Sequence, residues 1–208
     1  AVGHPLSPTA IRALLAEYGL EPSRALGQNF VADPNTVRRI ARLAGVGPGD
    51  RVVEIGAGLG SLTLALVETG AAVTAVEVDR HLLPILRQVV ADRPVTVVPG
   101  DAMELDWDAV LGPTDPERPW ALVANLPYNI ATPLVLNLLL GVPQIERMLV
   151  MVQKEVAERL AAGPGHKAYG IPSVKRAWWA DAELVGRVPP SVFVPPPRVD
   201  SALVAIRR

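Results

Sequence analysis

The densest group of residues suited to chemistry is a glycine-rich run, Glu54-Ile55-Gly56-Ala57-Gly58-Leu59-Gly60, between a β-branched segment and a helical one. Glycines allow a sharp turn and a close approach of the backbone to a ligand, and the first turn of the next helix offers free amides. Glu77 ends the following predicted strand, where a carboxylate can accept hydrogen bonds from both ribose hydroxyls. The arrangement predicts a site for an adenosine-containing cofactor, with a purely structural turn as the alternative.

The details of this run favour S-adenosylmethionine over a nicotinamide dinucleotide. The dinucleotide fingerprint is G-x-G-x-x-G, whereas here the third glycine is Gly60 and Ser61 stands where the fingerprint has glycine. Glu54 fits poorly beside a pyrophosphate and well beside the amino and sulfonium cations of S-adenosylmethionine. The pattern E-x-G-x-G-x-G is typical of class I methyltransferases. Asp101 and Ala102, after the third predicted strand, are expected to contact the adenine, and a helix N-cap is the other interpretation of Asp101.

A second group, Asn125-Leu126-Pro127-Tyr128, follows the fourth predicted strand and suits methylation of an amine on a base. The N6 amine of adenine is a poor nucleophile because its lone pair is delocalised into the ring. The Asn125 side-chain oxygen and the Leu126 carbonyl could each accept one amine hydrogen and draw that lone pair out. Pro127 stiffens the turn, and Tyr128 offers a face on which an extruded base can stack. A plain turn with Tyr128 packed on the core is the alternative.

The elements that must position these residues alternate in type from Arg51 onward. Predicted strands alternate with predicted helices, the strands covering 51–55, 72–78, 95–98, 120–125 and 146–152 and the helices 61–70, 79–92, 132–141 and 153–163. This alternation predicts an α/β fold: a doubly wound, mainly parallel sheet with helices on both faces. A helix over 171–180 and strands over 182–188 and 201–208 predict a C-terminal antiparallel hairpin at the sheet edge. Residues 1–50 are predicted to form an N-terminal helical cap segment with helices at 8–19 and 34–44, and Trp178-Trp179 are expected in the core rather than in base stacking.

Composition excludes several classes of protein. The 208 residues include no cysteine, which excludes disulfides, thiolate metal sites and a cysteine nucleophile, and three scattered histidines argue against a metal site. No apolar run reaches the roughly 18 residues of a membrane span. The first ten residues lack the layout of a signal peptide, so we expect a cytoplasmic protein. Net charge is −1, but residues 126–208 carry ten basic and six acidic side chains, which could meet a polyanion.

Taken together, the motifs resemble the ribosomal RNA adenine dimethyltransferases, in particular the bacterial small-subunit type. The resemblance covers about residues 24–206. It rests on a series of segments in the family's order: Gly27-Gln28-Asn29-Phe30, Glu54–Gly60, Asn125–Ile130, Gln153-Lys154-Glu155, Lys167-Ala168-Tyr169-Gly170 and Phe193–Ser201.

This resemblance implies a class I methyltransferase (Rossmann-like) catalytic domain over residues 1–208, with the family's small C-terminal helical domain absent from the sequence. It implies transfer of methyl groups from S-adenosylmethionine to two adjacent adenosines near the 3′ end of 16S rRNA in the small ribosomal subunit, giving N6,N6-dimethyladenosine, with a role in subunit biogenesis.

The resemblance also implies roles for single residues. Gln28, Asn29 and Val31 line the cofactor entrance, Gly56 and Gly58 approach the methionine part, and Glu77 and Asp101 contact the ribose and the adenine. Asn125, Leu126 and Tyr128 hold the base, and Asn125 also borders the cofactor. Phe193 adds a second stacking face, or else anchors the proline-rich loop.

Three other functions remain open at this point. A macrolide-resistance type would dimethylate one adenosine in large-subunit rRNA, and a non-catalytic assembly factor would only dock on rRNA. A DNA adenine methyltransferase is disfavoured because no target-recognition domain is present, so DNA and membrane partners are not expected, nor is a metal. A monomer is expected from the resemblance. The basic C-terminal half is predicted to contact RNA phosphates through six side chains: Arg147, Lys154, Arg159, Lys167, Lys175 and Arg176.

Overall fold

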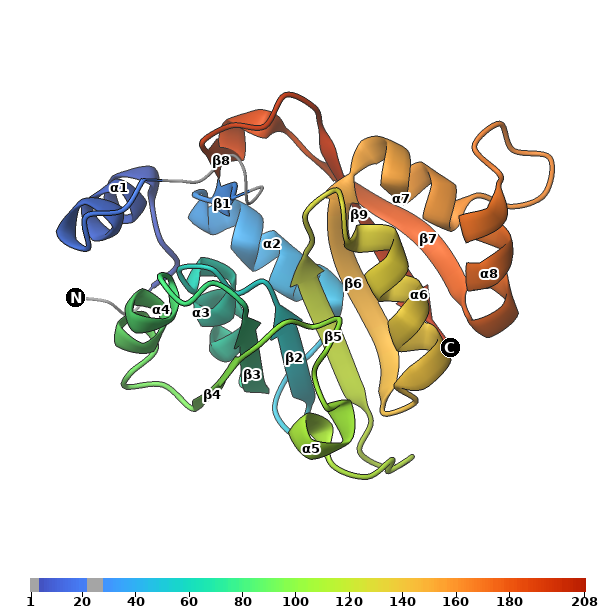
Figure 1. Cartoon of the computed structure of the whole chain (residues 1–208), viewed down its shortest axis with the longest axis horizontal. Coiled ribbons are helices and arrows are strands. Elements are labelled where there is room, and N and C mark those ends of the chain that lie inside the picture. Colours follow the sequence, from blue (N-terminus) through green and yellow to red (C-terminus); the bar gives the residue numbers. More distant parts are fainter. Residues whose placement is uncertain (1–3, 22–27) are drawn as a thin grey trace.

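A seven-stranded sheet forms the centre of the computed structural model, which describes residues 4–21 and 28–208 and so leaves Gly27 of the first motif outside the described residues. The strand order is β4-β3-β2-β5-β6-β9-β7 (Figure 1). Five strands pair in parallel: β2 (Arg51–Ile55), β3 (Ala72–Glu77), β4 (Val95–Pro99), β5 (Trp120–Asn125) and β6 (Ile145–Gln153). The sixth and seventh, β7 (Asp181–Val188) and β9 (Ser201–Arg207), form the predicted antiparallel hairpin, with β9 inserted between β6 and β7.

Helices cover both faces of the sheet, as the alternating pattern predicted. On one face α2 (Pro34–Ala44) and α3 (Ser61–Glu68) pack over Val123 and its neighbours, and on the other α6 (Ala131–Gly141) and α7 (Lys154–Ala161) pack over Leu122. Consecutive residues of β5 serve opposite cores because side chains alternate along a strand. No helix within residues 4–21 and 28–208 is both long and apolar enough to cross a bilayer.

A third core lies where α1 (Pro8–Glu17) and α4 (Leu83–Val89) meet Phe30. The sequence predicted α4 over 79–92, which is too long at both ends. Asp79 and the residues after it form a turn, in which the amides of Leu82 and Leu83 donate to the Asp79 carbonyl. The helix therefore begins at Leu83, with Pro84 in its first turn, where a missing amide costs nothing.

Four short elements in the described residues were not predicted: α5 (Trp107–Leu111), the 3-10 helix η1 (Pro190–Val192) and the two-residue strands β1 (Phe30–Val31) and β8 (Phe193–Val194). The two strands pair antiparallel in a separate small sheet, with Val31 opposite Phe193. Two residues are too few to carry a periodic pattern, so only the folded chain reveals this pairing between segments far apart in sequence.

The order of the strands reverses between β2 and β5, because β3 and β4 continue to one side and β6 to the other. In doubly wound folds the carboxyl ends of the strands at such a switch point border the ligand crevice. The glycine-rich run follows β2, and Asn125 ends β5. The topology therefore brings the two predicted groups of functional residues to the same place.

The orientation of α8 (Ile171–Trp179) overturns one expectation. Trp178 is 82% exposed and Trp179 is 40% exposed, so neither belongs to the core. The residues that α8 buries are instead Ser173 and Arg176. These two polar side chains point inward because they donate hydrogen bonds to backbone carbonyls at the end of α7.

Arg176 is a structural residue, which makes its predicted contact with RNA phosphate wrong. Its side chain is 7% exposed, and its guanidinium donates to the carbonyls of Leu160, Ala162 and Ala180 at 2.8, 3.1 and 3.1 Å. The last carbonyls of a helix have no partner within it, and Arg176 supplies donors to two carbonyls around the end of α7 and to the Ala180 carbonyl after α8. Because the side chain is buried, it is not presented to a phosphate outside.

Replacing Arg176 with methionine is expected to lower the free energy of unfolding by at least about 2 kcal/mol, because three enclosed carbonyls lose their donor. Lys175→Met is the matched control, since Lys175 is the exposed neighbour on the same helix and should change stability little. Urea unfolding of both variants measures the difference. Equal effects would mean that the guanidinium does not hold the end of α7.

Candidate active site

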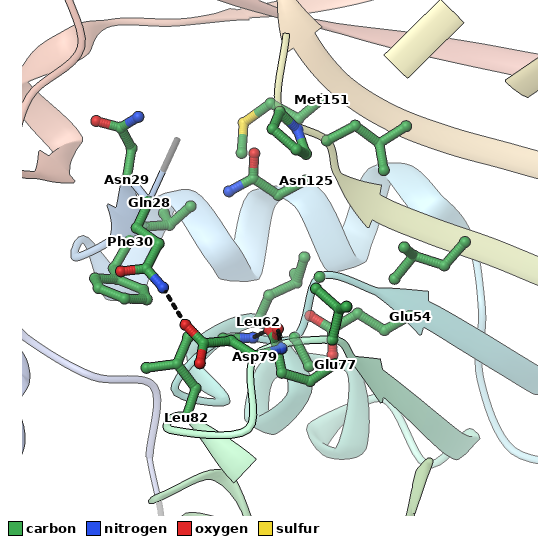
Figure 2. Close-up of a pocket in the computed structure, with 18 of the residues that line it drawn as sticks. Gln28, Asn29, Phe30, Glu54, Leu62, Glu77, Asp79, Leu82, Asn125 and Met151 are labelled. Atoms are coloured by element: carbon green, nitrogen blue, oxygen red, sulfur yellow. Dashed lines mark hydrogen bonds between the residues drawn. The ribbon is translucent and has the colours of Figure 1, made fainter. Parts of the chain in front are cut away.

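A cavity of about 530 Å³ opens at the carboxyl ends of the central strands. Every residue predicted for catalysis and for cofactor binding lines this cavity. These are Gln28, Asn29, Val31, Glu54, Gly56, Gly58, Glu77, Asp101, Ala102, Asn125, Leu126, Pro127, Tyr128 and Phe193. Figure 2 shows Asn125 facing the same space as Gln28 and Phe30, with Glu54 and Glu77 farther along the wall. The structure thus gathers segments separated by more than 150 residues around one space.

The glycine-rich run forms a tight turn against the end of β5. Gly56, Gly58 and Gly60 have φ values of +75°, +59° and +93°, a region in which L side chains are strained. A Cβ at Gly56 would lie 2.9 Å from the Asn125 carbonyl oxygen. Backbone from β2 and backbone from β5 therefore touch at this point, which only glycine allows. Ser61, at the position that distinguishes this run from a dinucleotide site, instead accepts a hydrogen bond from the Leu6 amide at 2.9 Å.

Two buried carboxylates lie beside the turn. Both oxygens of Glu77 accept backbone amides, from Gly58 at 2.7 Å and from Asp79 at 2.8 Å, which orients the carboxylate at the end of β3. Burial raises the pKa of Glu77, and these amide bonds oppose the increase. Glu54 is 1% exposed and accepts a hydrogen bond from the Thr63 hydroxyl. Burial raises the pKa of Glu54 to about 8, against the lowering effect of Thr63. A cation bound in the cavity would favour the ionised form of both groups.

The raised pKa of Glu54 predicts a pH-dependent stability for the chain without cofactor. Between the ordinary value of 4.5 and about 8, the folded protein keeps a proton on Glu54 that the unfolded chain has lost. The unfolding midpoint should therefore fall as pH rises through this window, because the unfolded state binds fewer protons. Calorimetry from pH 5 to pH 8 on the parent and on Glu54→Gln measures the effect, and the variant should show a shallower decline. Glu117→Gln, which removes an exposed carboxyl, serves as the control; a Glu54→Gln slope equal to the parent's would contradict the assignment.

Asp101 forms a turn and is not the helix N-cap that the sequence offered as one interpretation. Its Oδ1 accepts the Met103 amide at 2.9 Å, and its backbone carbonyl accepts the amides of Glu104 and Leu105. The side chain thus stabilises a turn rather than the start of a helix, and it still lines the cavity beside Ala102. A contact from Asp101 to an adenine stays a prediction.

The Asn125–Tyr128 segment leaves β5 in a constrained turn. The Leu126 amide donates to the Met151 carbonyl at 3.0 Å, and the Pro127 carbonyl accepts the amides of Ile130 and Ala131 at the start of α6. Tyr128 lies on the cavity wall and is 65% exposed, so it is not packed in the core. Backbone bonds on both sides of the turn hold it in place, while the Asn125 and Tyr128 side chains remain accessible from the cavity.

Asp79 lines the cavity but was not among the residues predicted from the sequence. It accepts a hydrogen bond from the Gln28 side chain at 2.6 Å (Figure 2) and from the His81 amide at 2.8 Å. Its signal in the sequence was weak: a second acid two residues after Glu77. Phe193, which the resemblance indicated, is 4% exposed and belongs to β8 opposite Val31.

The basic side chains predicted to bind RNA lie outside the cavity and do not form one group. Lys154 and Arg159 on α7, Lys167 in the following loop and Lys175 on α8 are exposed. Arg147 lies near the start of β6, at the opposite end of the strand from the cavity, and its guanidinium donates to the carbonyls of Ala44 and Gly45. Arg147 therefore does not share a surface with the other four.

Comparison with known proteins supplies independent evidence. The family profile described as "Ribosomal RNA adenine dimethylase" matches residues 21–208. The protein named "Ribosomal RNA small subunit methyltransferase A" from Cutibacterium acnes is 53% identical over 207 residues, which cover 98% of this chain and 68% of that protein. A 23S rRNA methyltransferase, ErmE, aligns with a TM-score of 0.71 at 32% identity, covering 86% of this chain and 70% of the other. A dimethyladenosine transferase from Plasmodium falciparum aligns with a TM-score of 0.71 at 28% identity, covering 86% and 62%.

Proposed function

Because the chain belongs to the ribosomal RNA adenine dimethylase family, we propose that it methylates the N6 amines of two adjacent adenosines near the 3′ end of small-subunit rRNA, with S-adenosylmethionine as donor. One observation carries the proposal: the glycine turn after β2 and the Asn125–Tyr128 turn after β5 open on one cavity and touch at Gly56. The 53% identity to a small-subunit enzyme, against 32% to a 23S enzyme, supports the small subunit as substrate.

The cavity fits the proposed cofactor in size and in chemistry. Its volume of about 530 Å³ lies within the range of small-molecule sites, and Gly56 and Gly58 line it without a side chain. Glu77 would accept the ribose hydroxyls, Asp101 and Ala102 would contact the adenine, and Glu54 would face the positive end. Gln28, Asn29 and Val31 would close the opposite side. When bound, S-adenosylmethionine supplies an electrophilic methyl group on a sulfonium.

The target half of the cavity would position the amine. The Asn125 side-chain oxygen and the Leu126 carbonyl accept the two N6 hydrogens, and this favours a tetrahedral nitrogen whose lone pair is free to attack. Tyr128 would offer the face on which the extruded base stacks, and Phe193, which is mostly buried but lines the same cavity, would border the base. The nitrogen loses its proton to solvent after the new bond forms, because methylation makes that proton acidic. Positioning and electrostatics therefore account for the catalysis.

Residues 1–208 would form the catalytic domain, with 1–50 as a cap over the cofactor half. All residues proposed for catalysis and for the cofactor come from one chain and line one cavity, so a monomer would suffice for the reaction. Outside the cavity, rRNA phosphates would be contacted through Lys154, Arg159, Lys167 and Lys175, the exposed cations of α7, α8 and the loop between them.

The decisive experiment is methyl transfer from labelled S-adenosylmethionine to small ribosomal subunits that lack the modification, followed by nucleoside analysis of the digested RNA. We expect labelled N6,N6-dimethyladenosine in small-subunit RNA and none in large-subunit RNA. Label in large-subunit RNA would support the macrolide-resistance type instead. Tight cofactor binding without transfer to either subunit would favour a non-catalytic assembly factor.

Binding of small-subunit rRNA is expected to weaken steeply with salt, because each phosphate contact releases a counterion. Lys175→Glu should reduce the slope of log Kd against log salt by about one, as expected for the loss of one contact. Filter binding between about 50 and 200 mM salt, a range over which such affinities change strongly, measures it. Arg42→Glu, an equal charge change on α2 at a distance from α7 and α8, is the control. If both variants change the slope equally, the α7–α8 surface is not the RNA contact.

A further inference from the structure

A bond across the rim of the cavity joins two segments that face each other. The Gln28 side-chain amide donates to Asp79 Oδ2 at 2.6 Å (Figure 2). Gln28 precedes β1, Asp79 follows β3, and both line the cavity. A hydrogen bond to a carboxylate is stronger than one between neutral groups, so this contact can hold Gln28 and the strand β1 that follows it against the body of the domain.

Asp79 is itself held rigidly. Its Oδ1 accepts the His81 amide at 2.8 Å, and its own amide donates to Glu77 Oε2 at 2.8 Å. The other oxygen of Glu77 accepts the Gly58 amide. A continuous chain of hydrogen bonds therefore runs from the glycine turn through Glu77 and Asp79 to Gln28.

The segment that Gln28 begins continues directly into the target half of the cavity. Two residues later β1 pairs with β8, where Val31 lies opposite Phe193, and the Ala32 amide donates to the Val192 carbonyl at 2.7 Å. Two strands of two residues each are too short to be stable alone. Phe193 packs in the same core cluster as Val31, so whatever holds β1 contributes to the place of Phe193.

We propose that Asp79 is a positioning residue that couples the two halves of the cavity: through Gln28 it fixes β1, and through the β1–β8 pairing it fixes Phe193 where the target base stacks. The proposal rests on the function proposed above. Its consequence is that cofactor and RNA bind cooperatively, because a ligand on the Glu77 side stabilises the segment that places Phe193. By reciprocity the RNA strengthens cofactor binding by the same factor.

The test measures the Kd of unmodified small subunits with and without saturating S-adenosylhomocysteine. In the parent chain the ligand should tighten subunit binding at least about fivefold. Asp79→Ala and Gln28→Ala should each bring that ratio close to one and raise the Kd of S-adenosylhomocysteine about tenfold. The ratio is the informative quantity, because a general loss of stability would weaken binding without removing the cooperativity.

A sharper test exchanges the amide and the carboxylate group between positions 28 and 79. Gln28→Glu places two carboxylates together and should remove the cooperativity. The double variant Gln28→Glu/Asp79→Asn restores a carboxylate–amide bond with donor and acceptor reversed, and the Asn oxygen can still accept the His81 amide. It should recover most of the parent's ratio. A double variant no better than Gln28→Glu alone would overturn the proposal.

Asp115→Asn is the matched control, since Asp115 also accepts the amide two residues later, from Glu117 at 3.0 Å, but lies in the loop before β5, far from the cavity. Its ratio should equal the parent's. Suppose that the parent binds S-adenosylhomocysteine and methylates RNA. A ratio of subunit Kd values equal to one, or a ratio that Asp79→Ala leaves unchanged, would then overturn the coupling and leave the proposed function intact. A parent that neither binds the cofactor nor methylates RNA would overturn both.

Discussion

Asn125→Ala is expected to lower kcat for methyl transfer by roughly 100- to 1000-fold, the cost of removing one well-placed hydrogen-bonding group from a transition state. The Asn125 side chain faces the cavity from the end of β5 (Figure 2) and would accept one N6 hydrogen of the target. Without that acceptor, the lone pair stays conjugated with the ring. Single-turnover methylation of small subunits measures the loss.

The control for this prediction is Asn137→Ala, an equal substitution at an exposed position of α6. It should leave kcat within about twofold, since surface changes of this kind have small effects. Asn125→Asp keeps an accepting oxygen and should retain more activity than Asn125→Ala. Retention of near-parental kcat by Asn125→Ala would show that the amine is held by other groups.

The second large effect is expected from Gly56→Ala, which should raise the Kd of S-adenosylmethionine by about 10- to 100-fold, corresponding to the 1–3 kcal/mol of a strained backbone. Gly56 has φ +75°, and a Cβ there would lie 2.9 Å from the Asn125 carbonyl oxygen. Because this contact is with backbone and not with a flexible side chain, the turn must move away from β5. Calorimetric titration measures the affinity, and kcat should fall too as Asn125 shifts.

Gly112→Ala separates the two causes of that effect. Gly112 has φ +77°, almost the same as Gly56, but a Cβ there would meet nothing within 4 Å. Both variants place a side chain at a positive φ, and only Gly56→Ala adds the clash with β5. Gly112 has ψ −169°, a combination with its φ that essentially only glycine adopts, so Gly112→Ala should lower the unfolding midpoint but leave the cofactor affinity unchanged. Equal losses of affinity in both variants would mean that general destabilisation, not the turn, is responsible.

The sequence alone determined the α/β architecture and where most elements begin and end. Apolar periodicity, helix caps and glycines are local signals, so they can be recognised in the sequence without knowledge of the fold. Asp33 caps α2, Pro34 takes its first position and Gly45 ends it at φ +64°. The candidate residues Asn125 and Glu77 were also found locally, because both follow predicted strands at the edge where ligands bind in such sheets.

Tertiary structure alone decided which side chains meet. The pairing of Val31 with Phe193 and the bond from Gln28 to Asp79 join segments distant in sequence and leave no periodic trace. Trp178 faces outward and Arg176 inward because the carbonyls at the end of α7 need donors. The raised pKa of Glu54 likewise arises from burial under surrounding elements. Hydrophobicity patterns describe each element by itself, whereas hydrogen-bond satisfaction and burial depend on neighbours that only the folded chain supplies.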